Sequence, residues 1–287
     1  MTPQNVSDLK SAIQLLWIQG LKKEAVAYEQ NARKSGIVGI GSCHTEEILD
    51  SFITCDKDML KLKDEIRLIE SIDDPVLIRG ETGTGKELIA NALHGSRGPV
   101  CENGATITSS TAGVRGRFVA INCPALSVDL MASTLFGHVK GAFTGCVGDK
   151  VGAFQYAWKG TLFIDEIGDM PSSMQAAILR VLQEKVITRV GSNEDIKVDV
   201  RIVCATNKNL EKMVEQGTFR LDLLQRINTF ELYTKPLRDR QQDMVALVKL
   251  WDKRGNFPLE KAIATGLPGN VRELQSRIKR WNVLGRI

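Results

Sequence analysis

No apolar run in this 287-residue sequence reaches the roughly 18–20 residues that a membrane-spanning helix needs. The first residues, Met-Thr-Pro-Gln-Asn-Val-Ser-Asp, do not show the basic and then apolar pattern of a secretory signal. The six cysteines are scattered and form no Cys-x-x-Cys pair, which argues against a zinc site or a disulfide framework. These absences predict a cytoplasmic protein without a membrane partner, whose cysteines are free thiols.

Charge and composition are those of an ordinary globular protein, because 43% of the residues are hydrophobic and 25% are charged. The length allows one large domain or two modest ones. A formal net charge of +4 is compatible with anionic partners, but it does not identify a nucleic-acid-binding protein.

Two short amphipathic helices are predicted near the start of the chain. Residues 6–18 and 21–33 each carry apolar side chains at helical spacing, and Gly20 separates them. We interpret residues 1–40 as a helical hairpin that serves packing or oligomerisation. A partner-binding or regulatory role for this hairpin is the alternative.

Strands and helices alternate over residues 46–235, which predicts an α/β core domain with a parallel sheet covered on both faces. The pattern turns helical after Pro236, so residues 236–287 are predicted to form a short helical lid. The fully apolar segment 160–164 is expected to be the central strand, and 98–116 is expected to be a long surface loop. The predicted strands are 75–79, 118–121, 160–164 and 198–205, and the main predicted helices are 87–94, 174–184 and 272–281.

A glycine-rich loop follows the first of these strands and opens a helix, which is the setting of a phosphate-binding P-loop. Its glycines let backbone N–H groups turn toward phosphates, and Lys86 supplies a positive charge for the β- and γ-phosphates. Glu87 stands where many P-loops have Ser or Thr, so Mg²⁺ is left to Thr84, the acidic strand end or water. The predicted nucleotide-binding residues are Gly80, Glu81, Thr82, Gly83, Thr84, Gly85, Lys86 and Glu87.

Two carboxylates end the apolar strand 160–164. At the carboxyl edge of a parallel sheet, Asp165 is placed to position Mg²⁺ beside the phosphate loop. Glu166 is placed to polarise the attacking water as a general base. A nucleoside triphosphate and Mg²⁺ are therefore the predicted cofactors.

Residues 141–146 read Gly-Ala-Phe-Thr-Gly-Cys and predict an exposed, mobile loop tip. An apolar Phe143 on such a tip is costly unless a partner covers it. Three arginines, Arg220, Arg226 and Arg272, are candidates for a cation on the γ-phosphate, although a lone arginine is ordinarily a surface charge.

The ordered motifs of this chain closely resemble the central AAA+ domain of bacterial enhancer-binding proteins, the activators of sigma-54 RNA polymerase. The resemblance runs from about residue 52 to 243 and resumes over 268–278. It rests on Gly80-Glu-Thr-Gly-Thr-Gly-Lys-Glu87, Phe118-Val-Ala-Ile-Asn-Cys123, Leu135-Phe-Gly-His138, Gly141-Ala-Phe-Thr-Gly145, Gly160-Thr-Leu-Phe-Ile-Asp-Glu-Ile-Gly168, Arg201-Ile-Val-Cys-Ala-Thr-Asn207 and Pro268-Gly-Asn-Val-Arg-Glu-Leu274.

The resemblance implies an AAA+ P-loop ATPase that forms a homo-oligomeric ring, a hexamer in that family, and remodels the closed promoter complex of sigma-54 polymerase. Asn122 would be the switch residue that restrains Glu166 until the γ-phosphate is sensed. By the same resemblance Thr206 and Asn207 would form the first sensor, Arg220 and Arg226 the trans-acting arginine fingers, and Arg272 the second sensor. Phe143, Thr144 and Gly145 would be the loop residues that contact the sigma factor.

The chain departs from that family at several points. Cys146 replaces the final Ala of the loop signature, the lid between 243 and 268 is short, and the 98–116 connection is long. No DNA-binding domain is recognised in this chain. These departures favour two alternatives: a AAA+ remodeller of a different protein or nucleoprotein client, and a non-hydrolysing switch that joins rings. The intact Lys86, Asp165 and Glu166 argue against the second.

Overall fold

The computed structural model describes residues 42–95, 116–143 and 146–286. The predicted helical hairpin over 1–40, most of the predicted 98–116 loop, and the loop-tip residues Thr144 and Gly145 lie outside the described residues. Within the described part, no helix is long and apolar enough to cross a membrane. Cys55, Cys123, Cys146 and Cys204 are free thiols, as the sequence predicts for these four.

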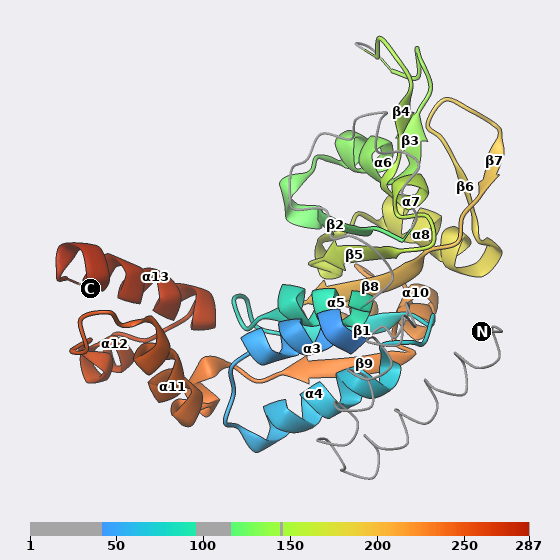
Figure 1. Cartoon of the computed structure of the whole chain (residues 1–287). Coiled ribbons are helices and arrows are strands. Elements are labelled where there is room, and N and C mark those ends of the chain that lie inside the picture. Colours follow the sequence, from blue (N-terminus) through green and yellow to red (C-terminus); the bar gives the residue numbers. More distant parts are fainter. Residues whose placement is uncertain (1–41, 96–115, 144–145, 287) are drawn as a thin grey trace, which may run out of the picture.

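A five-stranded parallel sheet forms the centre of the molecule (Figure 1), in the spatial order β2-β5-β8-β1-β9. Segment 160–164 was expected to be central, but β5 lies second from the edge and the middle strand is β8, which is buried at every position. Apolar content predicts an interior strand, and it does not distinguish between interior positions. The strands are β1 Val76–Gly80, β2 Phe118–Asn122, β5 Thr161–Asp165, β8 Arg201–Thr206 and β9 Phe230–Thr234.

Helices cover both faces of this sheet. Successive strand residues point to opposite sides, so each face presents apolar side chains to the helices. On one face, Leu77 and Ile164 pack against α6, α7, α8 and α10; on the other, Ile78 and Phe163 pack against α3, α4 and α5. The predicted doubly covered α/β sheet is confirmed. The helices are α3 Ser42–Ser51, α4 Lys57–Ile69, α5 Lys86–His94, α6 Val128–Phe136, α7 Ala153–Tyr156, α8 Ser172–Glu184, α9 Leu210–Glu215 and α10 Leu221–Ile227, with short 3-10 turns η3 Cys123–Ala125 and η4 Ile167–Asp169.

Two small hairpins extend from the same end of the sheet (Figure 1). One pairs β3 Gly137–His138 with β4 Lys150–Val151, and the other pairs β6 Val186–Thr188 with β7 Asp195–Lys197. The hairpins touch, because the Val139 N–H donates to the Val190 carbonyl at 3.1 Å. A Cβ added at Gly191 would lie 2.7 Å from the Cβ of Ala142. Val139 and Ala142, in the loop that follows β3, therefore contact the second hairpin.

Three helices follow Pro236, in agreement with the predicted helical pattern. The lid consists of the turn η5 Leu237–Asp239 and of α11 Gln241–Trp251, α12 Leu259–Ala264 and α13 Asn270–Leu284. It has its own hydrophobic core, distinct from the two that flank the sheet, and Figure 1 shows it at the end away from the hairpins. The lid is thus a separately packed unit joined to the sheet through β9.

One buried cation holds three elements of the core together. The Arg201 guanidinium, at the start of β8, donates to the carbonyls of Ile69 at 2.8 Å, Glu70 at 2.7 Å and Leu93. Arg201 is only 3% exposed, and its bonds to the Ile69 and Leu93 carbonyls are buried, so these two acceptors rely on it as a donor. It therefore joins the C-terminal ends of α4 and α5 to the central strand.

We expect Arg201→Ala to lower the free energy of unfolding by at least about 3 kcal/mol, because several buried carbonyls would lose their donor. Urea unfolding followed by circular dichroism measures this change. The matched control is Arg180→Ala, whose side chain is 48% exposed in a surface ion-pair cluster and whose loss should cost below about 1 kcal/mol. Equal effects of the two substitutions would contradict this account.

Candidate functional site

The P-loop joins the end of β1 to the start of α5 at the carboxyl edge of the sheet. Gly83 and Gly85 have φ values of 77° and 104°, a left-handed conformation that glycine adopts without strain. This conformation turns the chain tightly before Lys86, the first residue of α5. The loop and the helix N-terminus together form the backbone arrangement that binds phosphate groups.

Lys86 lies at the centre of the site and is buried, with 7% exposure. Its Nζ donates to the carbonyl of Gly80 at 2.9 Å and to that of Glu81 at 3.3 Å. The same atom forms an ion pair with Oε1 of Glu166 at 3.3 Å. The structure therefore brings the predicted phosphate-binding cation and the predicted general base together, although 80 residues separate them in sequence.

The Asp165–Glu166 pair ends β5 beside this lysine. Glu166 adopts the left-handed conformation, with φ 54° and ψ 53°, which is strained for a residue other than glycine. Its N–H donates to Oδ1 of Asp165 at 3.1 Å. Burial, followed by the nearby Glu166 charge, raises the pKa of Asp165. Holding the two carboxylates close together therefore lowers the stability of the folded state.

One of the two predicted sensor residues, Asn207, which follows β8, contacts Glu166 of this pair. The backbone N–H of Asn207 donates to Oε2 of Glu166 at 3.0 Å, and its side-chain amide donates to Oγ1 of Thr82 at 3.1 Å. Thr206 is fully buried. Asn207 therefore links the carboxylate of Glu166 to the P-loop.

Asn122 ends β2 and lies opposite Asp165 in the parallel register. Among the hydrogen bonds of the described residues, none joins Asn122 to Glu166, whose carboxylate contacts Lys86 and Asn207. The switch contact that the resemblance implies is therefore not formed in this conformation, although Asn122 lies on the adjacent strand.

Thr84 was one candidate for a magnesium ligand. Its hydroxyl is buried, donates to the Glu81 carbonyl at 2.8 Å, and lies 2.7 Å from the hydroxyl of Thr234 on β9. These contacts occupy Thr84 within the protein, so Asp165 offers the more suitable oxygen atoms. Mg²⁺ in nucleotide sites is usually held by one or two carboxylates together with phosphate and water oxygens, and the Asp165–Glu166 pair fits this pattern.

The lid contacts the P-loop through residues to which the sequence analysis assigned no role. Arg238, on η5, forms a two-pronged ion pair with Glu81, at 2.7 and 2.8 Å. The buried Asn270 side chain donates to Glu81 at 3.2 Å and to the Thr82 carbonyl at 3.0 Å, and accepts from the Leu237 N–H at 2.7 Å. Glu81 thus points toward the lid, and the Arg238 bonds lower its pKa.

The start of α13 rests directly on the P-loop. The Val271 N–H donates to the Gly83 carbonyl at 3.0 Å, and a Cβ at Gly83 would lie 2.1 Å from the Gly269 carbonyl oxygen. Arg272, the predicted second sensor, follows immediately and is exposed at this junction. The Gly-Asn dipeptide before a predicted helix was the available sequence signal for Asn270, whereas nothing local marked Arg238.

The predicted arginine fingers lie away from the Lys86–Glu166 cluster. Arg220 precedes α10, its side chain is 47% exposed, and it pairs with Asp222 at 2.6 Å. Arg226 is exposed near the end of the same helix. Neither guanidinium contacts the P-loop, Asp165 or Glu166 within the described residues.

The loop between β3 and β4 turns back on itself at Phe143. The Cys146 N–H donates to the Phe143 carbonyl at 3.1 Å, and the Gly141 N–H donates to the Cys146 carbonyl at 3.2 Å. The Phe143 ring meets His138 edge to face at 5.1 Å, yet Phe143 remains 43% exposed. An aromatic side chain therefore lies half in solvent at the turn.

Residues 52–233 match the protein family described as "Sigma-54 interaction domain". The chain belongs to this family. It is 44% identical over 243 residues to a signal-transduction and transcriptional-control protein of Clostridium beijerinckii, covering 80% of this chain and 36% of that protein. The response regulator protein PilR of Pseudomonas aeruginosa is 42% identical over 234 residues, which cover 77% of this chain and 49% of PilR. This confirms the predicted resemblance to the sigma-54 activators.

The crystal structure of NtrX from Brucella abortus in complex with ATP has a similar fold, with a TM-score of 0.67 and 28% sequence identity. The match covers 94% of this chain and 59% of that one. The AAA+ ATPase fold of the sigma-54 activators is thereby confirmed. The chain spans about a third to a half of the curated relatives described above.

We expect Asp165→Asn to raise the Tm of this sigma-54 interaction domain at pH 7.5. Burial raises the pKa of Asp165, so its ionised form is less stable in the folded protein than in the unfolded chain. The stabilisation should decline as the pH falls through the raised pKa, and vanish below the ordinary aspartate pKa of about 3.9, where the carboxyl is protonated in both states.

Thermal unfolding of both proteins between pH 3.5 and pH 8 measures this difference. Asp199→Asn is the matched control, because Asp199 is exposed and its replacement should leave the Tm nearly unchanged. A lower Tm for Asp165→Asn at pH 7.5 would contradict the assignment of a destabilising carboxylate.

Proposed function

We propose that this chain hydrolyses ATP and uses the energy to remodel the closed complex of sigma-54 RNA polymerase through its 141–146 loop. The observation that carries the proposal is the convergence of Lys86, Asp165, Glu166 and Asn207 at one sheet edge in a sigma-54 interaction domain. ATP and Mg²⁺ are the proposed cofactors.

Catalysis rests on positioning and charge. Lys86 and the N-terminus of α5 would hold the β- and γ-phosphates, and Glu166 would accept a proton from the attacking water. Asp165 would hold Mg²⁺, which when bound neutralises charge on the phosphate oxygens. The present ion pair between Lys86 and Glu166 would open as the phosphates take over the ammonium group.

The lid would report the state of the nucleotide. Glu81 and Thr82 belong to the loop that would surround the phosphates, and the lid residues Asn270 and Arg238 bind this loop. A change in the loop on nucleotide binding would therefore shift the start of α13 and its Arg272. We place Arg272 as the lid residue that senses the phosphates.

The arginine fingers would act between subunits. Arg220, just before α10, and Arg226, on α10, are exposed and do not contact the phosphate site of their own chain. A ring of identical subunits presents each such surface to the next subunit. We therefore propose a homo-oligomeric ring, a hexamer as in the family, in which Arg220 completes the neighbouring site once it leaves Asp222.

A continuous structural route leads from the catalytic carboxylate to the loop. Glu166 immediately precedes η4, and α8 follows. The chain then passes from α8 directly into the β6–β7 hairpin, which Ala142 of the loop contacts. Asp169 on η4 also pairs with Lys208 beside Asn207, at 2.5 Å. A movement of Glu166 would thus displace the second hairpin and, with it, Phe143.

A different protein client is the second candidate, favoured by Cys146. Its thiol lies 3.4 Å from the Val139 carbonyl and 3.5 Å from the Gly148 carbonyl, contacts that an alanine cannot make. These contacts stabilise a particular turn at the tip. The ATPase mechanism would be the same, and only the loop surface presented to the partner protein would differ.

We expect Arg220→Ala to lower ATP turnover by about 10³-fold or more, the usual effect of losing an arginine finger. Glu166→Gln should also be inactive. An equimolar mixture of the two variants should recover up to about a quarter of wild-type turnover. In randomly assembled rings, one interface in four pairs an intact Glu166 with an intact Arg220 of the next subunit. Arg180→Ala, which removes an exposed arginine elsewhere, is the matched control.

The measurement is phosphate release as a function of protein concentration. Specific activity of the wild type should rise steeply with concentration if the ring completes the site. Flat activity, or no recovery in the mixture, would show that each chain hydrolyses ATP alone.

We expect Phe143→Ala to keep ATP turnover within about twofold of wild type and to weaken binding to sigma-54 at least about 30-fold, as for an aromatic interface anchor. Open-complex formation at a sigma-54 promoter should be lost. Val147→Ala is the matched control in the same loop, because Val147 is 85% exposed and is not at the turn.

Pull-down with sigma-54 and promoter opening by permanganate footprinting measure these effects. Normal opening by Phe143→Ala would exclude the loop as the output element. Wild-type protein that hydrolyses ATP but never opens the promoter, and that captures another stable partner, would establish the second candidate.

A further inference from the structure

The positive charge of this chain is concentrated in the lid. Residues 236–287 contain eleven lysines and arginines against five aspartates and glutamates, a formal net charge of +6. Residues 1–235 carry a formal net charge of −2. The modest overall charge of +4 therefore conceals a basic lid on a slightly acidic remainder.

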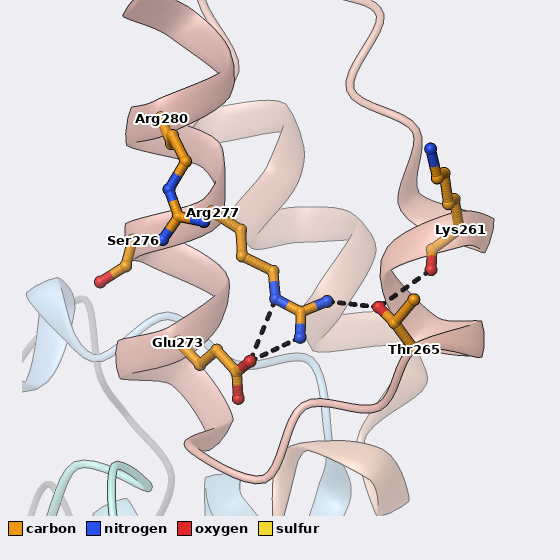
Figure 2. Close-up of a pocket in the computed structure, with 6 residues that line it drawn as sticks. All are labelled: Lys261, Thr265, Glu273, Ser276, Arg277 and Arg280. Carbon is orange, nitrogen blue, oxygen red and sulfur yellow. Dashed lines mark hydrogen bonds and ion pairs between the residues drawn. The ribbon is translucent and has the colours of Figure 1, made fainter. Parts of the chain in front are cut away.

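A pocket of about 340 Å³ opens between α12 and α13 on this lid. Figure 2 shows Arg277 reaching from α13 toward α12, with Arg280 on one side of it and Lys261 on the other. Three of the lining residues are cations and only one is an anion. The lining residues are Lys261, Thr265, Glu273, Ser276, Arg277 and Arg280.

The one carboxylate of the pocket is already neutralised. Oε1 of Glu273 accepts from Nε of Arg277 at 3.1 Å, and Oε2 accepts from the Gly269 N–H at 2.8 Å. The Gly269 bond and Arg277 both lower the pKa of Glu273, so it stays ionised and paired. Arg277 is held further by Thr265, at 2.6 Å, and by the Ala262 carbonyl.

Two cations of the pocket remain available to a ligand. Lys261 and Arg280 have no ion-pair partner within the part of the chain that the structure describes, and both are exposed. They extend from different helices on either side of the fixed Arg277 guanidinium. A polyanion lying across both helices would meet an unpaired positive charge on each of them.

We propose that this lid pocket binds the phosphate groups of a nucleic-acid backbone, with Lys261 and Arg280 as the contacting cations. Lysine and arginine are the usual partners of backbone phosphates. The pocket contains no aromatic ring on which a base could stack, so the contact would be independent of sequence. Lys253 and Lys279 are also exposed on this basic lid, and a spread of positive charge suits a polymer better than a single small anion.

The test compares duplex-DNA binding by the full chain and by the double variant Lys261→Gln/Arg280→Gln. Fluorescence anisotropy with a labelled 25-base-pair duplex, between 50 and 200 mM salt and without ATP, makes the result independent of hydrolysis and of any sigma-54 contact. The matched control is Lys197→Gln/Lys212→Gln, which removes the same charge from exposed positions on the core. Circular dichroism confirms that each variant is folded.

The wild type should bind duplex DNA, and the pocket variant should bind about tenfold more weakly or worse. Its plot of log affinity against log salt should lose about two units of slope, about 0.9 for each phosphate contact removed. Equal loss in the control variant would overturn the proposal, because the binding would then depend on total charge alone.

A competition experiment separates the polymer from a small anion. Inorganic tripolyphosphate is titrated into the Lys86→Ala protein, in which the P-loop cation is absent. Weak competition by tripolyphosphate supports a backbone contact. Tight binding of tripolyphosphate at this pocket, without any binding of duplex DNA, would overturn the nucleic-acid assignment.

Discussion

The parallel register of β1, β5 and β8 is the constraint on which the rest of the structure depends. Parallel strands end at one edge, so the P-loop after β1, the carboxylates after β5 and Asn207 after β8 meet there. The result is one connected set of contacts around Lys86 and Glu166. The strained backbone of Glu166 and the raised pKa of Asp165 are the costs of this convergence.

The site is also the point where the lid and the sheet meet. Glu81 belongs to the phosphate loop but directs its carboxylate to Arg238 and Asn270, so a single loop serves nucleotide and lid together. At the far end of the sheet, the loop with Phe143 rests on the hairpin that follows α8. In the proposed mechanism, the lid that senses the nucleotide therefore lies at one end of the sheet, and the loop that contacts the partner lies at the other.

The lid has a second proposed role, contact with nucleic acid, besides the proposed sensing of nucleotide. Its excess of positive charge and the pocket around Arg277 lie on helices whose other surfaces form the lid core. The proposed activity near a promoter would gain from a weak, salt-dependent contact with the DNA backbone, since such contacts raise encounter rates without depending on base sequence. The proposed backbone contact is thus compatible with either client.

Local sequence determined the elements that depend on neighbouring residues: the P-loop glycines, the apolar strand ending in Asp165 and Glu166, and the α/β alternation that defines the family. Tertiary structure alone decided the middle position of β8, the pairing of Thr84 with Thr234 and the binding of Glu81 by Arg238. Arg201 likewise serves carbonyls more than 100 residues away. Periodicity and turn chemistry act over a few residues, whereas these contacts depend on strand order and on how the lid is docked, which no local pattern encodes.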